Sequence, residues 1–408
     1  MKIELDDEIV LDDEIILDDD EKIDNDSSSY ILDIAKSSSY QNQNVEYYND
    51  YVKWRSKKNN KYGYAYVKDV REKTYVDGKG FVSDGPENAE SSTLSNCFRL
   101  IAILLIISQA FTLLENFLIE KVMGYESYSA NFFAYTSVKY DIDFAVVITY
   151  CAMNVLKLAV PILVFFLITD IPKSVVLPKA SNSNYELTVS GIAFMLMATI
   201  FGRIANFGLS RIFSLVGIRF SDFSFINTTD VKSIVLYAIC EYVVMSILLE
   251  IFFRGIVLQL FRQYGDMFAL LVSCITNVFF YNDFTMIGYI ALTSVIIGLF
   301  TLRSGSIYTA IAMRVSARIV TLVVSLGLSR IDNDIAVLVE AIVSIVIISF
   351  ALITYSRMVS KKPVNFNVSD SYTHLSTKTK FVIMFSSTTV IVWLVLVLLL
   401  MIFGVRFL

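Results

Sequence analysis

The sequence has very little histidine and no pattern of paired cysteines. Its one histidine, His374, lies in a polar stretch, where a lone histidine is more often a bystander than a metal ligand. The four cysteines, Cys97, Cys151, Cys240 and Cys274, follow no paired spacing. Three of them lie inside apolar runs, where cysteine behaves as a small hydrophobic residue. These residues therefore give no sign of a disulfide framework.

The signatures of several function classes are also missing. The chain has no serine-nucleophile motif, no phosphate-binding loop and no nucleic-acid-binding signature, so nucleic acid is not expected as a partner. No internal repeat of the kind that many transporters carry is visible. The opening residues, MKIELDDEIV, are acidic, whereas a secretory signal would be basic and then apolar, so no signal peptide is expected.

Apolar residues are abundant, at 55% of the 408 residues. They fall into nine runs, at 98–119, 144–169, 188–214, 231–261, 267–281, 284–302, 306–328, 335–356 and 380–403. A run of about 20 apolar residues is long enough to cross a bilayer as a helix. We therefore predict an all-α fold, a polytopic transmembrane helical bundle of about eight or nine spans, in contact with the lipid bilayer.

Two of these runs are irregular. The run at 267–281 is short, as expected of a half-buried or broken helix. In the run at 188–214, Arg203, Asn206 and Gly208 interrupt the apolar pattern and suggest a division into two pieces.

The residues before the first span differ in composition from the rest. Residues 1–44 contain a repeated acidic hexad (LDDEIV, LDDEII, LDDDEK) and serine-rich stretches, which predict a disordered tail because dense like charge repels itself. An acidic docking tail for a basic partner is the less favoured alternative. Residues 45–97 are assigned to a juxtamembrane module and linker, with the turn signal VDGKGF suggesting a small β-hairpin. Then follow the first transmembrane helices at 98–230, a core at 231–328 and C-terminal transmembrane helices at 335–408.

Basic residues near the ends of the spans indicate the orientation in the membrane. The last loop on the side of the amino terminus carries Arg357, Lys361, Lys362, Lys378 and Lys380. The loop after the third span argues mildly the other way. On balance we predict a multi-pass protein of the cell membrane with a cytoplasmic amino terminus.

The apolar runs of the core carry charged residues, namely Glu241, Glu250, Arg254, Arg314 and Arg318. Each charge at the centre of a membrane helix costs roughly 2.5–3.5 kcal/mol on an insertion scale. Four unpaired charges would then cost about 10–14 kcal/mol, which is comparable to the stability of a whole domain. These side chains are therefore expected to be paired or to face a wet cavity.

Three helices of the core each present a polar pair four residues apart, namely Glu250 with Arg254, Asn277 with Tyr281, and Arg314 with Arg318. Residues at this spacing share a helix face. Two arginines on one face repel each other unless an acid stands opposite, and Glu250 is the natural candidate. Glu241, nine residues before Glu250, is expected to face away from it. The cluster is either a salt-bridge lock that sets helix register or a substrate cavity.

The run Leu249-Glu250-Ile251-Phe252-Phe253-Arg254-Gly255 resembles the first motif of the CPBP family, also called Abi, which is named for CAAX prenyl proteases and bacteriocin-processing proteins. The resemblance extends from about Ser233 to Ser325 and covers about a quarter of the chain. Members are intramembrane metalloproteases that typically have eight helices. Their first motif has two glutamates, three further residues and an arginine, commonly within Phe-Arg-Gly. Gly255 is expected to allow a neighbouring helix or backbone segment to approach closely.

The chain departs from the family at the positions that carry the chemistry. The family's first glutamate is Leu249 here, the histidine of its second motif is Tyr281, and the histidine of its third motif is Arg314. The family uses zinc or another divalent metal, and a catalytic zinc needs three protein ligands of suitable type. We therefore expect no metal, no cofactor and no assignable catalytic residue here. Instead, Arg314 is expected to take the metal's place and pair with Glu250.

The resemblance implies intramembrane peptidase ancestry, with lipidated or membrane-anchored peptides as the substrate class. The replaced residues imply lost or impaired hydrolysis. We predict a pseudoprotease that binds a membrane-anchored peptide or a partner membrane protein. Its binding residues would be Glu250, Arg254, Asn277, Tyr281, Arg314 and Arg318. Two alternatives stay open: an active CAAX-type intramembrane peptidase with an unusual site, and a membrane transporter that uses the intramembrane charges.

Overall fold

The computed structural model describes residues 30–32, 43–57, 60–64, 66–68, 74–76, 80–82, 86–124, 143–180, 185–215, 218–219, 230–284, 286–328, 331, 333–361, 373, 375–403 and 406–407. Most of the predicted disordered tail at 1–44 lies outside these residues, as does His374. The chain divides into two units, one made of residues 1–32 and 66–84 and the other of residues 33–65 and 85–408.

The described part of the first unit is built of short strands in two antiparallel pairs: β1 (Tyr30–Leu32) with β2 (Tyr66–Lys68), and β3 (Thr74–Val76) with β4 (Gly80–Val82). Tyr75 lies opposite Phe81 in the second pair. This pair flanks the VDGKGF turn, where the sequence predicted a hairpin.

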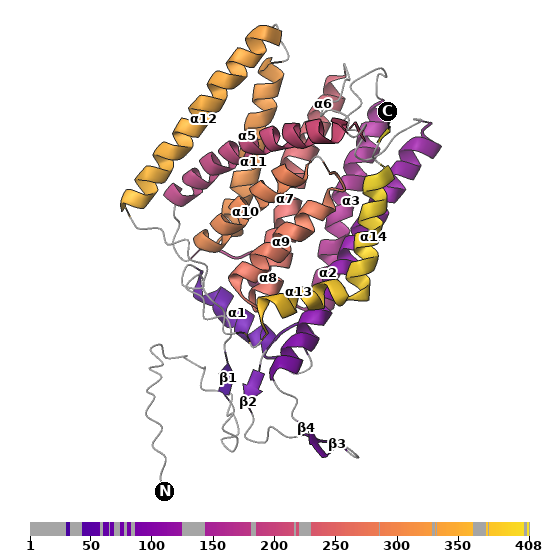
Figure 1. The fold of residues 1–408 in the computed structure, drawn as a ribbon, viewed down its shortest axis with the longest axis vertical. Helices are drawn as coiled ribbons and strands as arrows, with labels where there is room; N and C mark the ends of the chain where they lie inside the picture. Colours follow the sequence, from indigo (N-terminus) through magenta and orange to yellow (C-terminus); the bar gives the residue numbers. More distant parts are fainter. Residues whose placement is uncertain are drawn as a thin grey trace. The chain divides into compact units, whose positions relative to one another are not determined.

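The second unit is helical (Figure 1), and all nine predicted apolar runs form helices in it. Among the described residues, seven helices are long and apolar enough to cross a membrane: α2 (Pro86–Phe117), α3 (Phe144–Thr169), α5 (Tyr185–Leu215), the continuous helix at 231–262, α10 (Ile287–Ser304), α11 (Ile307–Leu328) and α12 (Asn333–Lys361). An eighth candidate is the pair α13 (Thr377–Ser386) and α14 (Thr388–Phe403), bent by 71°. α9 (Asp266–Phe280) is apolar but has 15 residues. These helices indicate a multi-pass helical membrane protein.

Short elements complete this unit. A π-helical turn, η2 (Leu118–Val122), extends α2. The strands β5 (Ile218–Arg219) and β6 (Arg406–Phe407) pair antiparallel, so that the chain after α14 lies beside the chain after α5.

The expected break in the third run is wrong, because α5 is one helix from Tyr185 to Leu215. The polar residues that suggested a break are satisfied from outside the helix. Arg203 forms an ion pair with Glu340 on α12, at 2.7 Å. The Asn206 side-chain oxygen accepts a hydrogen bond from the Tyr289 backbone, at 3.3 Å. Since these side chains bond to neighbouring helices, they do not compete with the backbone bonds of α5.

The helix at 231–262 carries two π-helical turns. It runs through α6 (Val231–Ala238), η4 (Ile239–Val244), α7 (Met245–Glu250), η5 (Ile251–Val257) and α8 (Leu258–Arg262). It begins at residue 231 because the side chain of Asp230 accepts hydrogen bonds from two backbone N–H groups of the first turn. It ends before Gly265, whose φ of 113° a side chain would disfavour. π-helical turns occur frequently at functional sites, and η5 follows directly on Glu250.

An apolar cluster joins α5, α10 and α11. Met195, Ile297, Phe300 and Met313 are all buried within it. Because successive helix residues differ by about 100°, Arg314, the residue after Met313, lies on a different face of α11, and α11 contacts α7.

Gly255, in η5, lies against the short helix α4 (Lys173–Val176). A Cβ atom added at Gly255 would come within 2.6 Å of the Val176 carbonyl oxygen and 3.1 Å of Ile307 Cδ1. The close approach expected at this glycine is therefore present, and it brings the backbone of α4 against the helix that carries Glu250.

The first helix, α1 (Val45–Arg55), lies in the segment that the sequence assigned to a juxtamembrane module. Tyr47, Tyr51 and Trp54 recur at helical spacing and are all buried. They form one face of a helix that starts at the capping residue Asn44.

α1 is tied to the ends of two membrane helices. The Trp54 indole N–H donates to the Thr169 carbonyl at the end of α3, at 2.8 Å. The hydroxyls of Tyr47 and Tyr51 donate to the side chain and the backbone carbonyl of Gln259, both at 2.7 Å. Burial raises the pKa of Tyr51 well above its ordinary value, so its hydroxyl stays protonated and remains a donor. In Figure 1, α1, α8 and α13 lie at the same end of the helical unit.

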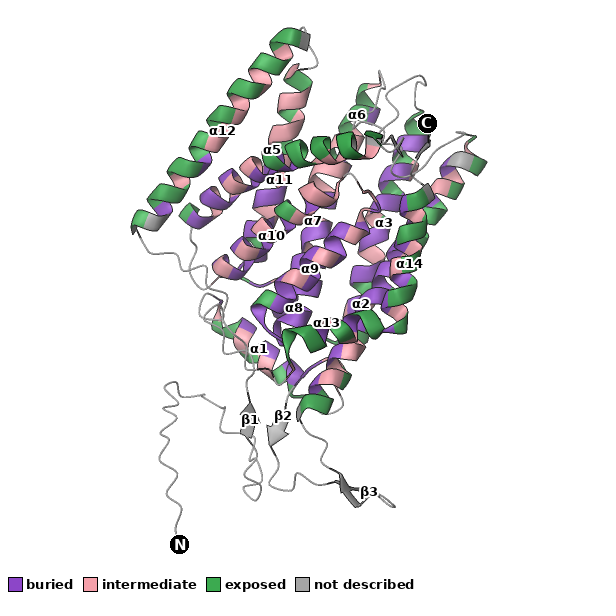
Figure 2. Cartoon of the chain, in the orientation of Figure 1, coloured by how far each residue is buried: buried purple, intermediate pink, exposed green. Residues whose placement is uncertain are grey.

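α12 is the least covered of the long helices. Only 6% of its most apolar window is buried, and Figure 2 shows it exposed along most of its length. It packs mainly on α5. An apolar helix with so little protein cover fits a lipid environment, where exposed apolar side chains are favourable.

We expect Gly255→Ala to destabilise the protein by about 1–3 kcal/mol, because its new methyl group would meet the Val176 carbonyl oxygen. Gly327→Ala is the matched control, since nothing lies within 4 Å of a Cβ at that helical position. Alanine favours a helix over glycine by about 0.5–1 kcal/mol, so the control should be neutral or stabilising. Thermal unfolding midpoints in detergent would test this pair, and equal midpoints would contradict the close approach.

Candidate functional site

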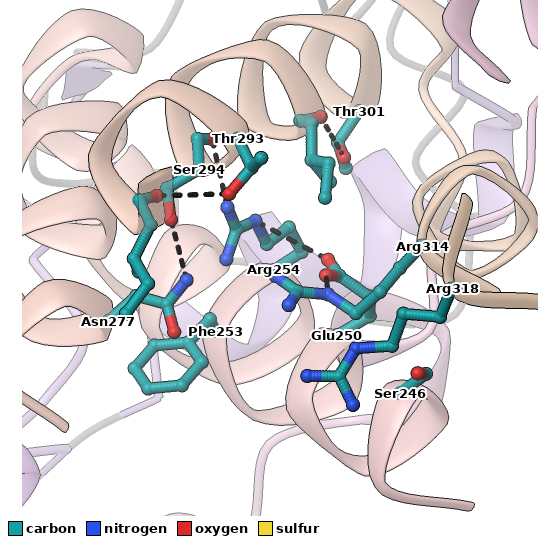
Figure 3. A network of polar contacts seen from close by, with 12 residues as sticks. Ser246, Glu250, Phe253, Arg254, Asn277, Thr293, Ser294, Thr301, Arg314 and Arg318 are labelled. Carbon is teal, nitrogen blue, oxygen red and sulfur yellow. Dashed lines mark hydrogen bonds and ion pairs between the residues drawn. The ribbon is translucent and has the colours of Figure 1, made fainter. Parts of the chain in front are cut away.

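Glu250 stands at the centre of a buried cluster of charges. Its carboxylate lies between two arginines from different helices (Figure 3). Arg314, on α11, donates a hydrogen bond from Nε to Glu250 Oε1. Arg254, on η5, places its Nε 3.4 Å from Glu250 Oε2. The side chains of Glu250 and Arg254 are completely buried, and that of Arg314 is 5% exposed. The pairing of Glu250 with Arg314 is the one that the sequence suggested.

Arg254 extends the cluster to α9 and α10. Its Nη2 donates to the Ser294 carbonyl, at 2.8 Å. The Asn277 amide donates to the Ser294 hydroxyl, at 2.6 Å. The Ser273 hydroxyl donates to the Phe253 carbonyl, at 2.9 Å. The first of these bonds holds the guanidinium group that faces Glu250, and the other two join its neighbours on η5, α9 and α10.

A second charge pair lies one turn farther along α11. Arg318 Nη1 donates to Glu241 Oε1 at 2.9 Å and to the Glu241 carbonyl at 2.7 Å. Its Nη2 donates to the Tyr281 hydroxyl, at 3.4 Å. The Tyr150 hydroxyl, from α3, donates to Glu241 Oε2, also at 3.4 Å.

The polar pairs that the sequence identified on α9 and α11 are therefore divided between two acids, Glu250 and Glu241. Arg314 bonds to Glu250 while Arg318 bonds to Glu241. Of the α9 pair, Asn277 belongs to the Glu250 side and Tyr281 to the Glu241 side. All six predicted site residues thus lie in two ion-pair clusters on α7–η5, η4, α9 and α11.

Sequence reasoning missed the contribution of α2 and α3. The Asn154 amide, on α3, donates to the carboxylate of Glu115, on α2, at 3.4 Å. Lys157 is buried, with its Nζ 4.7 Å from the centroid of the Phe280 ring. The signal was available in α3, because Tyr150, Asn154 and Lys157 repeat at helical spacing within an apolar run.

The site does not fit a divalent metal. Within the described residues, no group of three or more histidine, cysteine, aspartate or glutamate side chains is close enough to hold one. Glu250 faces two guanidinium groups, and its neighbour Leu249 is apolar and buried. Two fixed positive charges would repel a dication, while zinc requires nitrogen, sulfur or carboxylate ligands.

Comparison with known proteins supports a peptidase relationship for this segment. Residues 231–320 match the family model described as type II CAAX prenyl endopeptidase Rce1-like. The matched segment contains Glu250, Arg254 and Arg314, and it confirms the resemblance drawn from the motif residues. Neither curated proteins nor solved structures gave a match. The chain thus carries a CAAX-protease-like segment within a multi-pass helical membrane protein.

We expect Glu250→Gln and Arg314→Gln to differ sharply in stability, although each removes one partner of the same bond. Glu250→Gln leaves two buried arginines without an acid and should cost about 3–5 kcal/mol. Arg314→Gln leaves Glu250 paired with Arg254 and should cost less than about 1.5 kcal/mol. Unfolding midpoints in detergent, with Arg203→Gln on the exposed face as the control, would test this asymmetry. Equal losses at the two positions would contradict it.

Proposed function

We propose that this protein is a non-hydrolytic relative of the CAAX proteases, which binds a membrane-anchored peptide or a partner membrane protein. The CAAX-protease-like segment provides the helices, and the replaced residues remove the means of activating water. Such a protein would recognise its partner within the membrane without cleaving it.

One observation carries this proposal, namely the bond between Arg314 and Glu250. Arg314 stands at the position of the family's third-motif histidine. Its bond engages the Glu250 carboxylate, which would otherwise be free to act on a metal or a water molecule. Arg254 Nε lies 3.4 Å from the other oxygen of Glu250, which accepts no hydrogen bond, so each oxygen faces a guanidinium group. General base catalysis needs a group within hydrogen-bond reach of the proton that it removes, and this arrangement favours binding over that role.

A transporter is a second candidate, supported by the buried or half-buried ionisable residues of α2, α3, η4 and α11. Glu115, Lys157, Glu241 and Arg318 all lie inside the helical unit, on four different helices. Intramembrane charges of this kind often mark ion or substrate pathways. Uptake into proteoliposomes that depends on Glu241 or Lys157 would favour this candidate over the peptide-binding role.

We also propose that the protein lies in the cell membrane with its amino terminus in the cytoplasm. The basic loop residues indicate this orientation. α1, which precedes the first span, contacts Thr169 at the end of α3 and Gln259 near the end of the helix at 231–262, which supports placing these three segments on one side of the membrane.

Metal content is the first test of the non-hydrolytic role. We expect purified protein in detergent to contain near-zero zinc, manganese or cobalt by mass spectrometry, and Glu250→Gln to leave that value unchanged, because the residues around Glu250 do not fit a dication. A membrane-anchored peptide with a CAAX-type end should remain uncleaved. Stoichiometric metal that is lost in the variant, together with cleavage, would instead establish an active peptidase.

The orientation can be tested with added cysteines. All four native cysteines are buried, so a membrane-impermeant maleimide should report only the added thiol. Ser39→Cys, before the first helix, should be protected in intact cells and become labelled after permeabilisation. Asp143→Cys, at the exposed start of α3, should be labelled from outside. The reverse pattern would place the amino terminus outside the cell.

A further inference from the structure

The charges around Glu250 do not balance. One acid, Glu250, faces two arginines, Arg254 and Arg314, so that the cluster carries one surplus positive charge. Among the described residues, neither arginine forms an ion pair with another acid. Arginine does not lose its proton in proteins. Because an uncompensated buried charge costs several kcal/mol, the cluster requires a counter-anion.

The donors for such an anion are already in place. Arg254 Nη1 and Arg314 Nη2 are buried and have no hydrogen-bond partner. Each belongs to a guanidinium group that is held by other contacts, since Arg254 bonds to the Ser294 carbonyl and Arg314 bonds to Glu250. Figure 3 shows both guanidinium groups beside the Glu250 carboxylate. Two fixed and unsatisfied charged donors make the cluster receptive to an anion.

The adjacent charge pair provides an internal contrast. Arg318 and Glu241 form a one-to-one pair, in which Nη1 and Nη2 of the arginine both have partners. The surplus charge therefore belongs to the Glu250 cluster and not to the Glu241 pair. Of Glu250, Arg254 and Arg314, only Arg314 has exposed side-chain area, at 5%. A ligand would therefore reach the cluster at Arg314.

We propose that the Arg254–Glu250–Arg314 cluster is a binding site for a carboxylate. A carboxylate carries the single negative charge that the surplus requires, and its two oxygens can accept from two separate guanidinium donors. This inference rests on the proposed function and extends it, because it identifies the recognised group of a membrane peptide as its C-terminal carboxylate. A free small carboxylate has the same chemistry, and the experiment separates the two sources.

The test measures binding of a fluorescent apolar peptide to the full-length protein in detergent micelles. The probes are the peptide with a free C-terminal carboxylate, the same peptide with a C-terminal amide, and sodium acetate, which is used as a competitor and is also titrated alone by calorimetry. We expect the acid to bind more tightly than the amide. Arg314→Gln removes one donor and the surplus charge, and it should weaken acid binding at least about tenfold, or about 1.4 kcal/mol. Amide binding should not change.

Two further variants exclude a merely structural effect. Arg203→Gln removes an arginine from the exposed pair with Glu340 and should leave binding unchanged. Glu250→Gln raises the surplus from one positive charge to two and should tighten acid binding, whereas a structural lock would be loosened by the same change. If Glu250→Gln does not fold, Arg314→Gln, which retains a balanced pair, still decides the matter.

The outcomes separate the carboxylate site from the proposed peptide-binding role. Acid and amide binding equally, with no effect of Arg314→Gln, would overturn the carboxylate site and leave peptide binding intact. Acetate binding that depends on Arg314, without binding of either peptide, would support the anion site and contradict the peptide role. No binding of acetate or acid peptide by the wild-type protein would overturn the inference.

Discussion

The interaction on which the rest of the site depends is the bond between Glu250 and its two arginines, inside helices that are otherwise apolar. A buried charge is tolerated only with a partner in good geometry, so the presence of Glu250 constrains the helices around it. α11 must bring Arg314 to one oxygen and η5 must bring Arg254 near the other. α10 and α9 then hold Arg254 through Ser294 and Asn277. One carboxylate thereby couples four helical segments.

The same geometry places positive side chains around one acid, whereas a metal site gathers ligands around a positive ion. These residues lie within the segment that matches the CAAX-protease-like family model. The proposed carboxylate would be held by the unpartnered nitrogens of Arg254 and Arg314.

Spacing along the sequence established which residues share a face, but not which partner each would find. Arg314 and Arg318 are on one face of α11, yet one bonds to Glu250 and the other to Glu241. The reason is that α11 contacts both η4, which carries Glu241, and α7, which carries Glu250, so each arginine meets the acid of the segment opposite it. Ser294, which bonds to both Arg254 and Asn277, carried no charge or motif that would single it out.

The sequence alone determined the nine helical segments, because runs of apolar residues long enough for a bilayer favour helix wherever they occur. It also determined the Glu250–Arg254 pair, which the helical repeat sets locally. Only the tertiary structure decided that α5 is unbroken, that α1 docks on Gln259 and Thr169, and that the charge around Glu250 is unbalanced. Those features depend on contacts between residues far apart in the chain, and such contacts are fixed by how the helices pack rather than by any local pattern.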